Sequence, residues 1–299
     1  MEDFAFVIPK IDPALTDAVK RKIRNVPYAT GSPSQKMDVY FPETPVRSPL
    51  PVIAYFHGGA FMKGSRTDDS LEPMLRAVPE GFAVASVDYR LSGEARFPAM
   101  LYDAKAALRF LRSKAGEWNL DPDRIAVWGP SSGGWLVSML GATNGNPAFE
   151  DLSMGCADFS SDADAVIDWC GPAANFLNMD PALAASGAGI PDHNEEISPE
   201  SRFLGCQITK VPELCRLAAP VTHVTKDIPP FCIFHGERDQ VVPCEQSVAL
   251  AKAIEKAAGP GRAELHLEKG KPHHGHPWYH EKWVSDACIA FLNRVFYEQ

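Results

Sequence analysis

The stretch RIAVWGPSSGGW, residues 124–135, decides the fold. Its apolar run at 125–128 predicts a buried strand, and the apolar run at 135–140 predicts a helix. Between them stands Gly-x-Ser-x-Gly with Ser131 at its centre. A strand, a tight turn between glycines and a helix together form the context in which this pattern presents a nucleophilic serine. The rest of the chain must then supply an anion hole, an acid and a histidine.

Crowding explains why the turn needs glycines. Side chains at Gly129 or Gly133 are expected to collide with the neighbouring strand and helix. The helix that begins behind Ser131 offers free N–H groups and the positive end of its dipole, which suits a developing oxyanion. The competing interpretation is an ordinary loop rich in glycine and serine.

The composition is that of an ordinary globular protein. The chain has 299 residues, of which 45% are hydrophobic and 22% charged, and its net charge is −9. This charge argues against a nucleic-acid partner and against an anionic membrane surface. We see no internal repeat and no linker, so residues 1–299 are predicted to form a single domain.

The ends and cysteines of the chain bear on its location. The first residues have no basic region and only a very short apolar run, and no segment is long enough to cross a bilayer. The seven cysteines lack metal-type spacing, so we expect free thiols in a reducing, cytoplasmic setting. Bridges between Cys206 and Cys215 or between Cys156 and Cys170 are the alternative.

Strands and helices alternate along most of the chain. Strand-like runs at 52–56, 82–89, 125–128, 165–170, 230–236 and 263–267 are separated by helical patterns at 100–111, 135–140 and 244–258, and a final helix is expected at 280–296. A shorter helix is expected at 70–78 and an edge hairpin over 21–28 and 35–41. This alternation predicts an α/β fold, with helices flanking a mainly parallel central sheet.

A second chemical signal follows the strand at 52–56. His57-Gly58-Gly59-Ala60-Phe61 places small residues where backbone N–H groups can face a cleft. A His-Gly-Gly loop in this place supplies oxyanion donors in hydrolases of this architecture. We therefore predict an oxyanion hole at Gly58, Gly59 and Ala60, completed by the N–H of Ser132. His57 is expected to stiffen this loop.

The regular alternation of strands and helices stops between residues 171 and 227. A structureless loop of that length is implausible inside a compact domain. We therefore interpret 172–227 as an inserted cap of small helices that carries substrate selectivity, with a surface decoration as the alternative. Trp135, directly after the elbow, and Phe61, at the end of the His-Gly-Gly loop, are predicted to contact substrate.

The acid and the base come late in the chain. Asp239 lies in a loop just after the strand at 230–236, where open α/β sheets place their chemistry. His274 precedes Gly275 after the last strand, so the order Ser131, Asp239, His274 is that of an α/β-hydrolase. A serine needs an adjacent base, and the base needs a carboxylate partner.

Alternatives stay open at both positions. Glu237 competes with Asp239, and His273 is the second choice for the base. The cluster of His273, His274 and His276 also raises a metal site, although no accompanying acidic or cysteine ligands stand beside it in the sequence. We predict no cofactor and no metal.

With these residues in place, the chain resembles the esterases of the hormone-sensitive-lipase-like branch of α/β-hydrolases. Within it the chain is similar to small carboxylesterases related to acetyl-xylan and feruloyl esterases. The likeness rests on residues 57–61 and 129–134, on Asp239-x-x-Val242-Pro243 and on His274-Gly275, and it covers most of the chain from about Lys36. It extends through residues 89–91, 97–98, 120–125 and 198–201.

The resemblance implies a triad of Ser131, His274 and Asp239, an α/β-hydrolase fold with a helical cap, and no cofactor. The chain departs from the family pattern at Pro130, Ser132, Trp135 and His276, which bears on substrate shape more than on reaction type.

Three functions follow as hypotheses. The first is a serine carboxylic ester hydrolase that acts on small-molecule, short-chain acyl esters through an acyl-enzyme. The second uses the same triad as an aryl-formamidase-like amidase or a lactonase. The third is a catalytically retired ligand-binding protein, because fold alone does not fix function. The oligomeric state stays open, and a homodimer is one arrangement.

Overall fold

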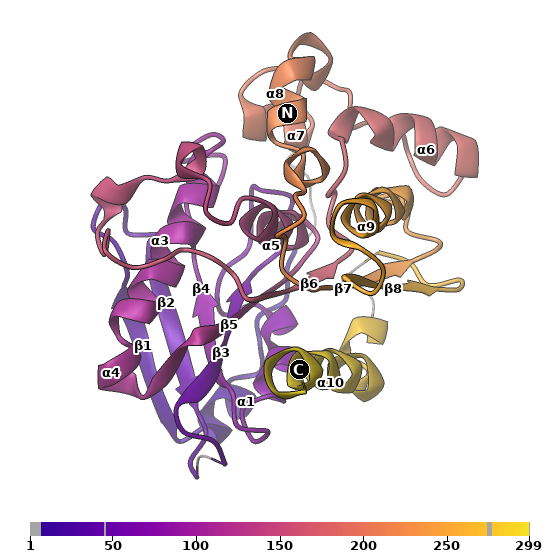
Figure 1. Ribbon diagram of the computed structural model, residues 1–299. Helices are drawn as coiled ribbons and strands as arrows, with labels where there is room; N and C mark the ends of the chain where they lie inside the picture. The colour runs from indigo at the N-terminus through magenta and orange to yellow at the C-terminus, as the bar shows by residue number, and fades with distance from the viewer. Residues whose placement is uncertain (1–6, 45, 274–276, 299) are drawn as a thin grey trace.

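A single eight-stranded sheet organises the molecule in the computed structural model (Figure 1), which describes residues 7–44, 46–273 and 277–298. The strand order is β1-β2-β4-β3-β5-β6-β7-β8. The strands are β1 (Arg21–Pro27), β2 (Lys36–Phe41), β3 (Leu50–Phe56), β4 (Ala83–Val87), β5 (Leu120–Pro130), β6 (Ala165–Trp169), β7 (Phe231–Gly236) and β8 (Ala263–Glu268).

The sheet is mainly parallel. Neighbouring strands are parallel from β4 through β3, β5, β6 and β7 to β8. Strand β2 runs antiparallel to both β1 and β4. The hairpin expected at the sheet edge is therefore present as β1 and β2. This arrangement confirms the predicted α/β-hydrolase fold.

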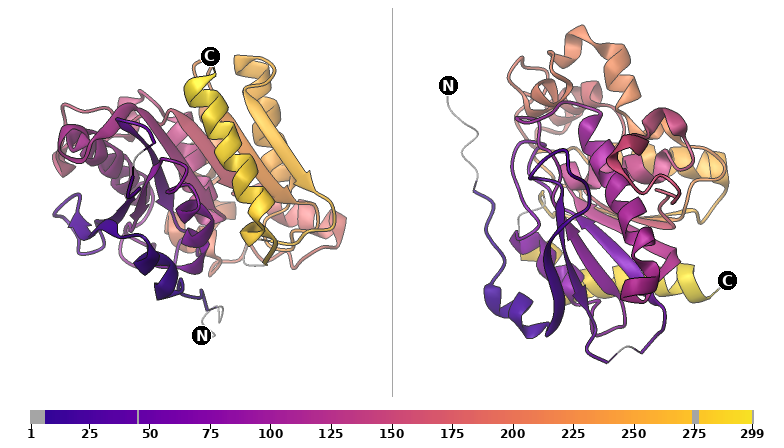
Figure 2. Two further views of the ribbon diagram at one scale, coloured as in Figure 1. Left: turned by 90° about the horizontal axis from the view of Figure 1, so that it is seen from below. Right: turned by 90° about the vertical axis from the view of Figure 1, so that its left-hand side faces the viewer.

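Helices cover both faces of the sheet. The α-helices are α1 (Pro13–Ala18), α2 (Glu72–Leu75), α3 (Ala99–Ser113), α4 (Ala115–Trp118), α5 (Ser132–Ala142), α6 (Met179–Ser186), α7 (Pro199–Leu204), α8 (Pro212–Leu217), α9 (Glu245–Ala258) and α10 (Lys282–Tyr297). Figure 2 shows α10 running along one face of the sheet, and α3, α5 and α9 lie on the other (Figure 1). The helix expected over 70–78 is shorter, because it ends in turns in which Ala77 and Val78 each donate to the third residue before them.

The central strands bury both of their faces. In β3, Val52, Ala54 and Phe56 join the core cluster that includes α3, α5 and α9. Ile53 and Tyr55 join the opposite cluster, which includes α2 and α10. Near-continuous apolar runs are what a parallel strand between two helical layers requires.

The segment 172–227 contains α6, α7 and α8 together with 3-10 turns. In Figure 1 these helices gather at the top of the view, on the side of the sheet that carries α5 and α9. Each of α6 and α7 ends at a left-handed glycine, Gly187 and Gly205, which allows the chain to reverse within a few residues.

All seven cysteines are free thiols, so neither of the two conceivable bridges forms. Cys170, Cys215, Cys232 and Cys288 are buried. Over the residues that the structure describes, we find no helix whose length and apolar character would let it cross a bilayer.

Candidate active site

Ser131 occupies a strained turn between β5 and α5. Its backbone lies at φ 53° and ψ −122°, a region that residues with a side chain rarely adopt. Its N–H donates to the carbonyl of Trp169 at 2.7 Å, which ties the turn to the end of β6. The turn therefore presents the hydroxyl at the carboxyl ends of the parallel strands.

The two flanking glycines are sterically required. A Cβ at Gly133 would lie 2.2 Å from the backbone oxygen of Phe56, and one at Gly129 would lie 2.6 Å from the backbone of Gly133. Neither neighbour can yield, because both are backbone atoms. The crowding expected from the sequence is thus present, and it comes from β3 and α5.

Asp239 lies in the loop after β7 and is almost completely buried. Its Oδ1 accepts the N–H groups of Val241 and Val242, each at 2.8 Å. Its Oδ2 accepts from His273 Nδ1 at 2.6 Å and lies 3.1 Å from His235 Nε2. Burial alone would raise the pKa of Asp239, but the two histidines outweigh burial and hold its pKa well below the usual value. The carboxylate is therefore ionised and fixed in orientation.

His273 connects the acid to the nucleophile. Its Nδ1 bonds to Asp239, and its Nε2 lies 3.1 Å from Ser131 Oγ. With Nδ1–H donating to the carboxylate, Nε2 of the neutral ring carries no hydrogen and can accept the serine proton. Burial lowers the pKa of His273, but the Asp239 carboxylate and Cys170 together outweigh burial and raise the pKa well above 6.5.

These contacts favour the second choice of histidine, His273, as the base. We expected His274 as the base, with His273 second, yet His273 stands between Asp239 and Ser131. His274 and His276 lie outside the described residues. Sequence spacing could not separate adjacent histidines, because the contacts of each ring depend on how the loop after β8 folds against the sheet.

A second histidine supports the acid, and the sequence analysis missed it. His235, at the end of β7, is fully buried. Its Nε2 faces both Asp239 Oδ2 and the carbonyl of Val242, at 3.1 and 2.8 Å, so Nε2 carries the proton. Its Nδ1 lies 2.7 Å from Ser247 Oγ and accepts that hydroxyl's hydrogen. The signal in the sequence was a histidine four residues before the acid, at the end of the preceding strand.

The loop 57–61 passes directly beside the nucleophile. A Cβ at Gly58 would lie 2.9 Å from the carbonyl oxygen of Pro130 and 3.5 Å from Ser131 Cβ. Gly59, Ala60 and Phe61 all have positive φ, at 126°, 54° and 63°. A turn of this kind can direct successive backbone N–H groups toward one side, where they form an anion-binding concavity. Across residues 7–44, 46–273 and 277–298, no hydrogen-bond acceptor is found for the N–H of Gly59, Ala60 or Ser132.

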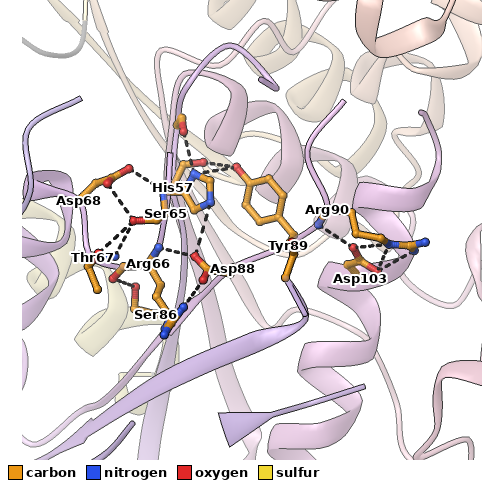
Figure 3. A network of polar contacts seen from close by, with 12 residues as sticks. His57, Ser65, Arg66, Thr67, Asp68, Ser86, Asp88, Tyr89, Arg90 and Asp103 are labelled. Carbon is orange, nitrogen blue, oxygen red and sulfur yellow. Dashed lines mark hydrogen bonds and ion pairs between the residues drawn. The ribbon is translucent and has the colours of Figure 1, made fainter. Parts of the chain in front are cut away.

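Figure 3 shows the network of polar contacts around His57 that supports this loop. The ring of His57 stacks on Tyr89 with centroids 4.3 Å apart, and its Nδ1 donates to the carbonyl of Gly58 at 2.8 Å. The Tyr89 hydroxyl donates to the carbonyl of His57. Arg66 pairs with Asp88, whose Oδ1 lies 4.0 Å from His57 Nε2. Burial lowers the pKa of His57, so His57 is a neutral support for the loop.

Trp135 and Phe61, the expected substrate contacts, are buried in an aromatic cluster. Trp135 is 0% and Phe61 2% exposed, and their centroids are 5.4 Å apart in an edge-to-face arrangement. Phe203 of α7 stacks on Phe61 at 4.3 Å. The Trp135 indole N–H donates to the carbonyl of Ala218 at 2.7 Å. The cluster thus joins the elbow and the oxyanion loop to the segment 172–227.

That segment also reaches the loop of the acid. His193 Nε2 lies 2.9 Å from the carbonyl of Val241, and its Nδ1 lies 3.1 Å from Glu200 of α7. Burial lowers the pKa of His193, but Glu200 outweighs it and raises the pKa to about 9. A Cβ at Gly189 would lie 2.0 Å from the carbonyl of Gln240, so the two loops touch through their backbones.

The possible metal ligands near the site are already engaged. Among the described residues, Cys170, Asp239 and His273 offer ligand atoms within 4.8 Å of one another. Asp239 and His273 bond directly to each other. Their arrangement is that of an acid and a base, and the competing acid Glu237 is absent from these contacts.

Most of the chain matches a known protein family. The BD-FAE family profile matches residues 37–254. Esterase LipC of Mycobacterium tuberculosis is 28% identical over 267 residues, which cover 88% of this chain and 63% of that protein. Carboxylesterase NlhH of the same organism is 39% identical over 133 residues, 44% of this chain and 40% of that protein. The chain thus spans about three fifths of the length of LipC.

Solved structures share the architecture. A truncated carbohydrate esterase from gut microbiota superposes with a TM-score of 0.80 at 30% identity, covering 97% of this chain and 99% of that chain. An esterase of Thermogutta terrifontis superposes with a TM-score of 0.70 at 24% identity, covering 91% of this chain and 92% of that one, which shows the fold alone.

Proposed function

The chain belongs to the BD-FAE family of α/β-hydrolases, and from this premise we propose that it is a serine carboxylic ester hydrolase for short acyl chains. The observation that carries the proposal is the continuous contact from Ser131 through His273 to Asp239. LipC and NlhH, which are named an esterase and a carboxylesterase, support it.

The reaction follows from the contacts. As Ser131 Oγ attacks the ester carbonyl, His273 Nε2 takes its proton, and the imidazolium is stabilised by Asp239. The same Nε2–H then protonates the leaving alcohol, which gives an acyl-serine. Water then attacks the acyl carbonyl and gives a proton to His273. As the bond to Ser131 Oγ breaks, His273 returns that proton to the serine oxygen and the carboxylic acid is released.

The oxyanion of each tetrahedral intermediate needs donors. We assign the N–H groups of Ser132, Gly59 and Ala60 to this role, with Gly58 positioning the loop against the nucleophile. Each good donor lowers the barrier enough to raise the rate by about 10²–10³-fold. The neutral His57 and Tyr89 fix the loop, so little reorganisation accompanies the reaction.

The buried aromatic cluster limits the acyl group. Phe61 and Trp135 have almost no exposed surface, and Phe203 closes the cluster from the segment 172–227. We propose that this segment is a cap within a single domain and that the two aromatic side chains bound a small acyl pocket. An acetyl or similarly short group fits such a pocket.

The direct test replaces Ser131 with alanine. Ser131→Ala should abolish hydrolysis of p-nitrophenyl acetate and labelling by a fluorophosphonate probe. Ser153→Ala, at an exposed serine whose side chain bonds to Asp151, is the matched control and should keep both. Labelling of folded Ser131→Ala would remove this residue from the mechanism.

The alternative reactions use the same groups. Amides and lactones pass through similar tetrahedral intermediates, so an acetyl ester, a lactone and an N-formyl aryl amine should be assayed side by side. Binding of a small ligand with no turnover of any of the three would favour a retired enzyme.

The expected partner is a small-molecule ester. Light scattering tests whether the protein forms a homodimer, and cell fractionation tests the proposed cytoplasmic location.

A further inference from the structure

A groove of about 610 Å³ lies beside the oxyanion loop. Three segments line it: residues 62–63 of that loop, residues 92–96 after β4, and residues 196–210 around α7. Its volume lies in the range of small-molecule sites. The groove lies beside the loop that carries the proposed oxyanion donors, and no residue of the triad lines it.

The floor of the groove is continuous with the oxyanion loop. The N–H of Lys63 donates to the carbonyl of Gly59 at 2.9 Å, and the N–H of Ser92 donates to the carbonyl of Phe61 at 2.8 Å. These bonds place the groove one loop turn from the residues that surround Ser131.

Its walls are fixed to each other. The N–H of Phe97 donates to the carbonyl of Phe203 at 3.0 Å, which joins the loop after β4 to α7. The side chain of Arg96 crosses Gly205, because a Cβ there would lie 2.3 Å from Arg96 Cδ and 2.6 Å from its Nε. A glycine at 205 leaves the space that Arg96 fills.

The lining is strongly basic in an acidic protein. Lys63, Arg96, Arg202 and Lys210 face a single carboxylate, Glu196, although the chain has a net charge of −9. Arg96, Arg202 and Lys210 form no ion pair with a carboxylate in the part of the chain that the structure describes. Arg202 Nε donates to the carbonyl of Ile197 at 3.0 Å, which orients its guanidinium. A cleft of one sign focuses its field on an oppositely charged ligand.

We propose that this groove binds a carboxylate carried by the alcohol part of the substrate, as in an acylated uronic acid. The inference rests on the proposed ester hydrolysis. The buried aromatic cluster leaves little room for a large acyl group, so the proposal assigns the larger part of the substrate, the alcohol, to the open groove. Arginines suit a carboxylate because the planar guanidinium can donate two parallel hydrogen bonds.

The test compares two substrates that differ only in charge: an acetylated methyl glucuronoside and the corresponding acetylated glucuronamide. The wild type should favour the acid by about tenfold in kcat/KM, mainly through KM, since three exposed ionic contacts contribute modestly. The variant with Arg96→Gln, Arg202→Gln and Lys210→Gln should lose this preference and keep its activity on the amide. High salt should have the same effect as the triple variant.

A matched triple variant controls for net charge. Lys20→Gln, Arg216→Gln and Lys226→Gln remove three exposed positive charges that do not line the groove, and they should leave the preference intact. Equal kcat/KM for the two substrates in the wild type, or an equal loss of preference in both triple variants, would overturn the proposal.

Calorimetry with unacetylated methyl glucuronoside separates the groove from catalysis. If p-nitrophenyl acetate is not hydrolysed, the proposed function fails, but the wild type should still bind the glucuronoside and the groove variant should not. Absence of binding to the wild type would overturn the groove itself.

Discussion

Oδ2 of Asp239 contacts two histidines, His273 at 2.6 Å and His235 at 3.1 Å. Its other oxygen accepts two backbone N–H groups, so every side of the carboxylate is occupied. An acid held in this way keeps the base that contacts it in one tautomer and one orientation. Two predictions depend on this contact, and three others concern the base, the elbow and its proline.

His235 is predicted to be a positioning residue for the acid. His235→Phe keeps a ring of similar breadth but removes the N–H donor, so kcat/KM should fall by about tenfold with KM little changed. Ser247→Ala, which removes only the donor to His235 Nδ1, should have a smaller effect. Thermal unfolding identifies variants that stay folded, and full activity in a folded His235→Phe would contradict the role.

The adjacent histidines can be separated by two parallel variants. His273→Ala should lower kcat/KM by at least about 10³-fold, because it removes the only base in contact with Ser131 among the described residues. His274→Ala should retain most activity. The reverse outcome would show that the loop rearranges when substrate binds.

The pH dependence follows from the raised pKa of His273. The base must be neutral to accept the serine proton, so a pKa well above 6.5 moves the acid limb of kcat/KM to higher pH. Activity should therefore be lost as pH falls toward 6.5 and should rise in the alkaline range. Asp239→Asn removes the carboxylate that raises this pKa, and the residual activity should show its acid limb at lower pH. An unshifted limb would mean that another group controls the profile.

Gly133 should tolerate no side chain. Gly133→Ala would place a Cβ 2.2 Å from the carbonyl oxygen of Phe56, and it should lower the free energy of unfolding by about 1–3 kcal/mol. Gly116→Ala in α4 is the matched control, because nothing lies within 4 Å of the added atom. Equal denaturation midpoints for the two variants would contradict the steric account of the elbow.

Pro130 should stiffen the elbow without taking part in catalysis. It ends β5 and pairs with Trp169, where its missing N–H and fixed φ suit the end of a strand. Pro130→Asp should therefore keep substantial p-nitrophenyl acetate hydrolysis. The proline ring lies close to the oxyanion loop, because a Cβ built on Gly58 would be 3.6 Å from Pro130 Cγ. A folded but inactive variant would show that this ring shapes the loop.

The sequence by itself determined the features that depend on local chemistry. The alternation of apolar strands and helices predicts the parallel sheet, and the glycines around Ser131 predict a turn that only small residues allow. The positions of Ser131, Asp239 and the loop at 57–61 follow because parallel strands deliver their carboxyl ends to one edge.

Tertiary structure decided what depends on contacts between distant segments. His273 and His274 are neighbours in the chain, and only the packing of residues 271–273 against the end of β7 brings the ring of His273 between Asp239 and Ser131. In the sequence, His235 is only a residue near the end of an apolar strand. Its burial beside Asp239 and Ser247 makes it part of the site. The basic groove brings together residues more than a hundred positions apart, from Lys63 to Lys210. Its positive charge comes from side chains that the fold places on one surface, so spacing along the chain could not predict it.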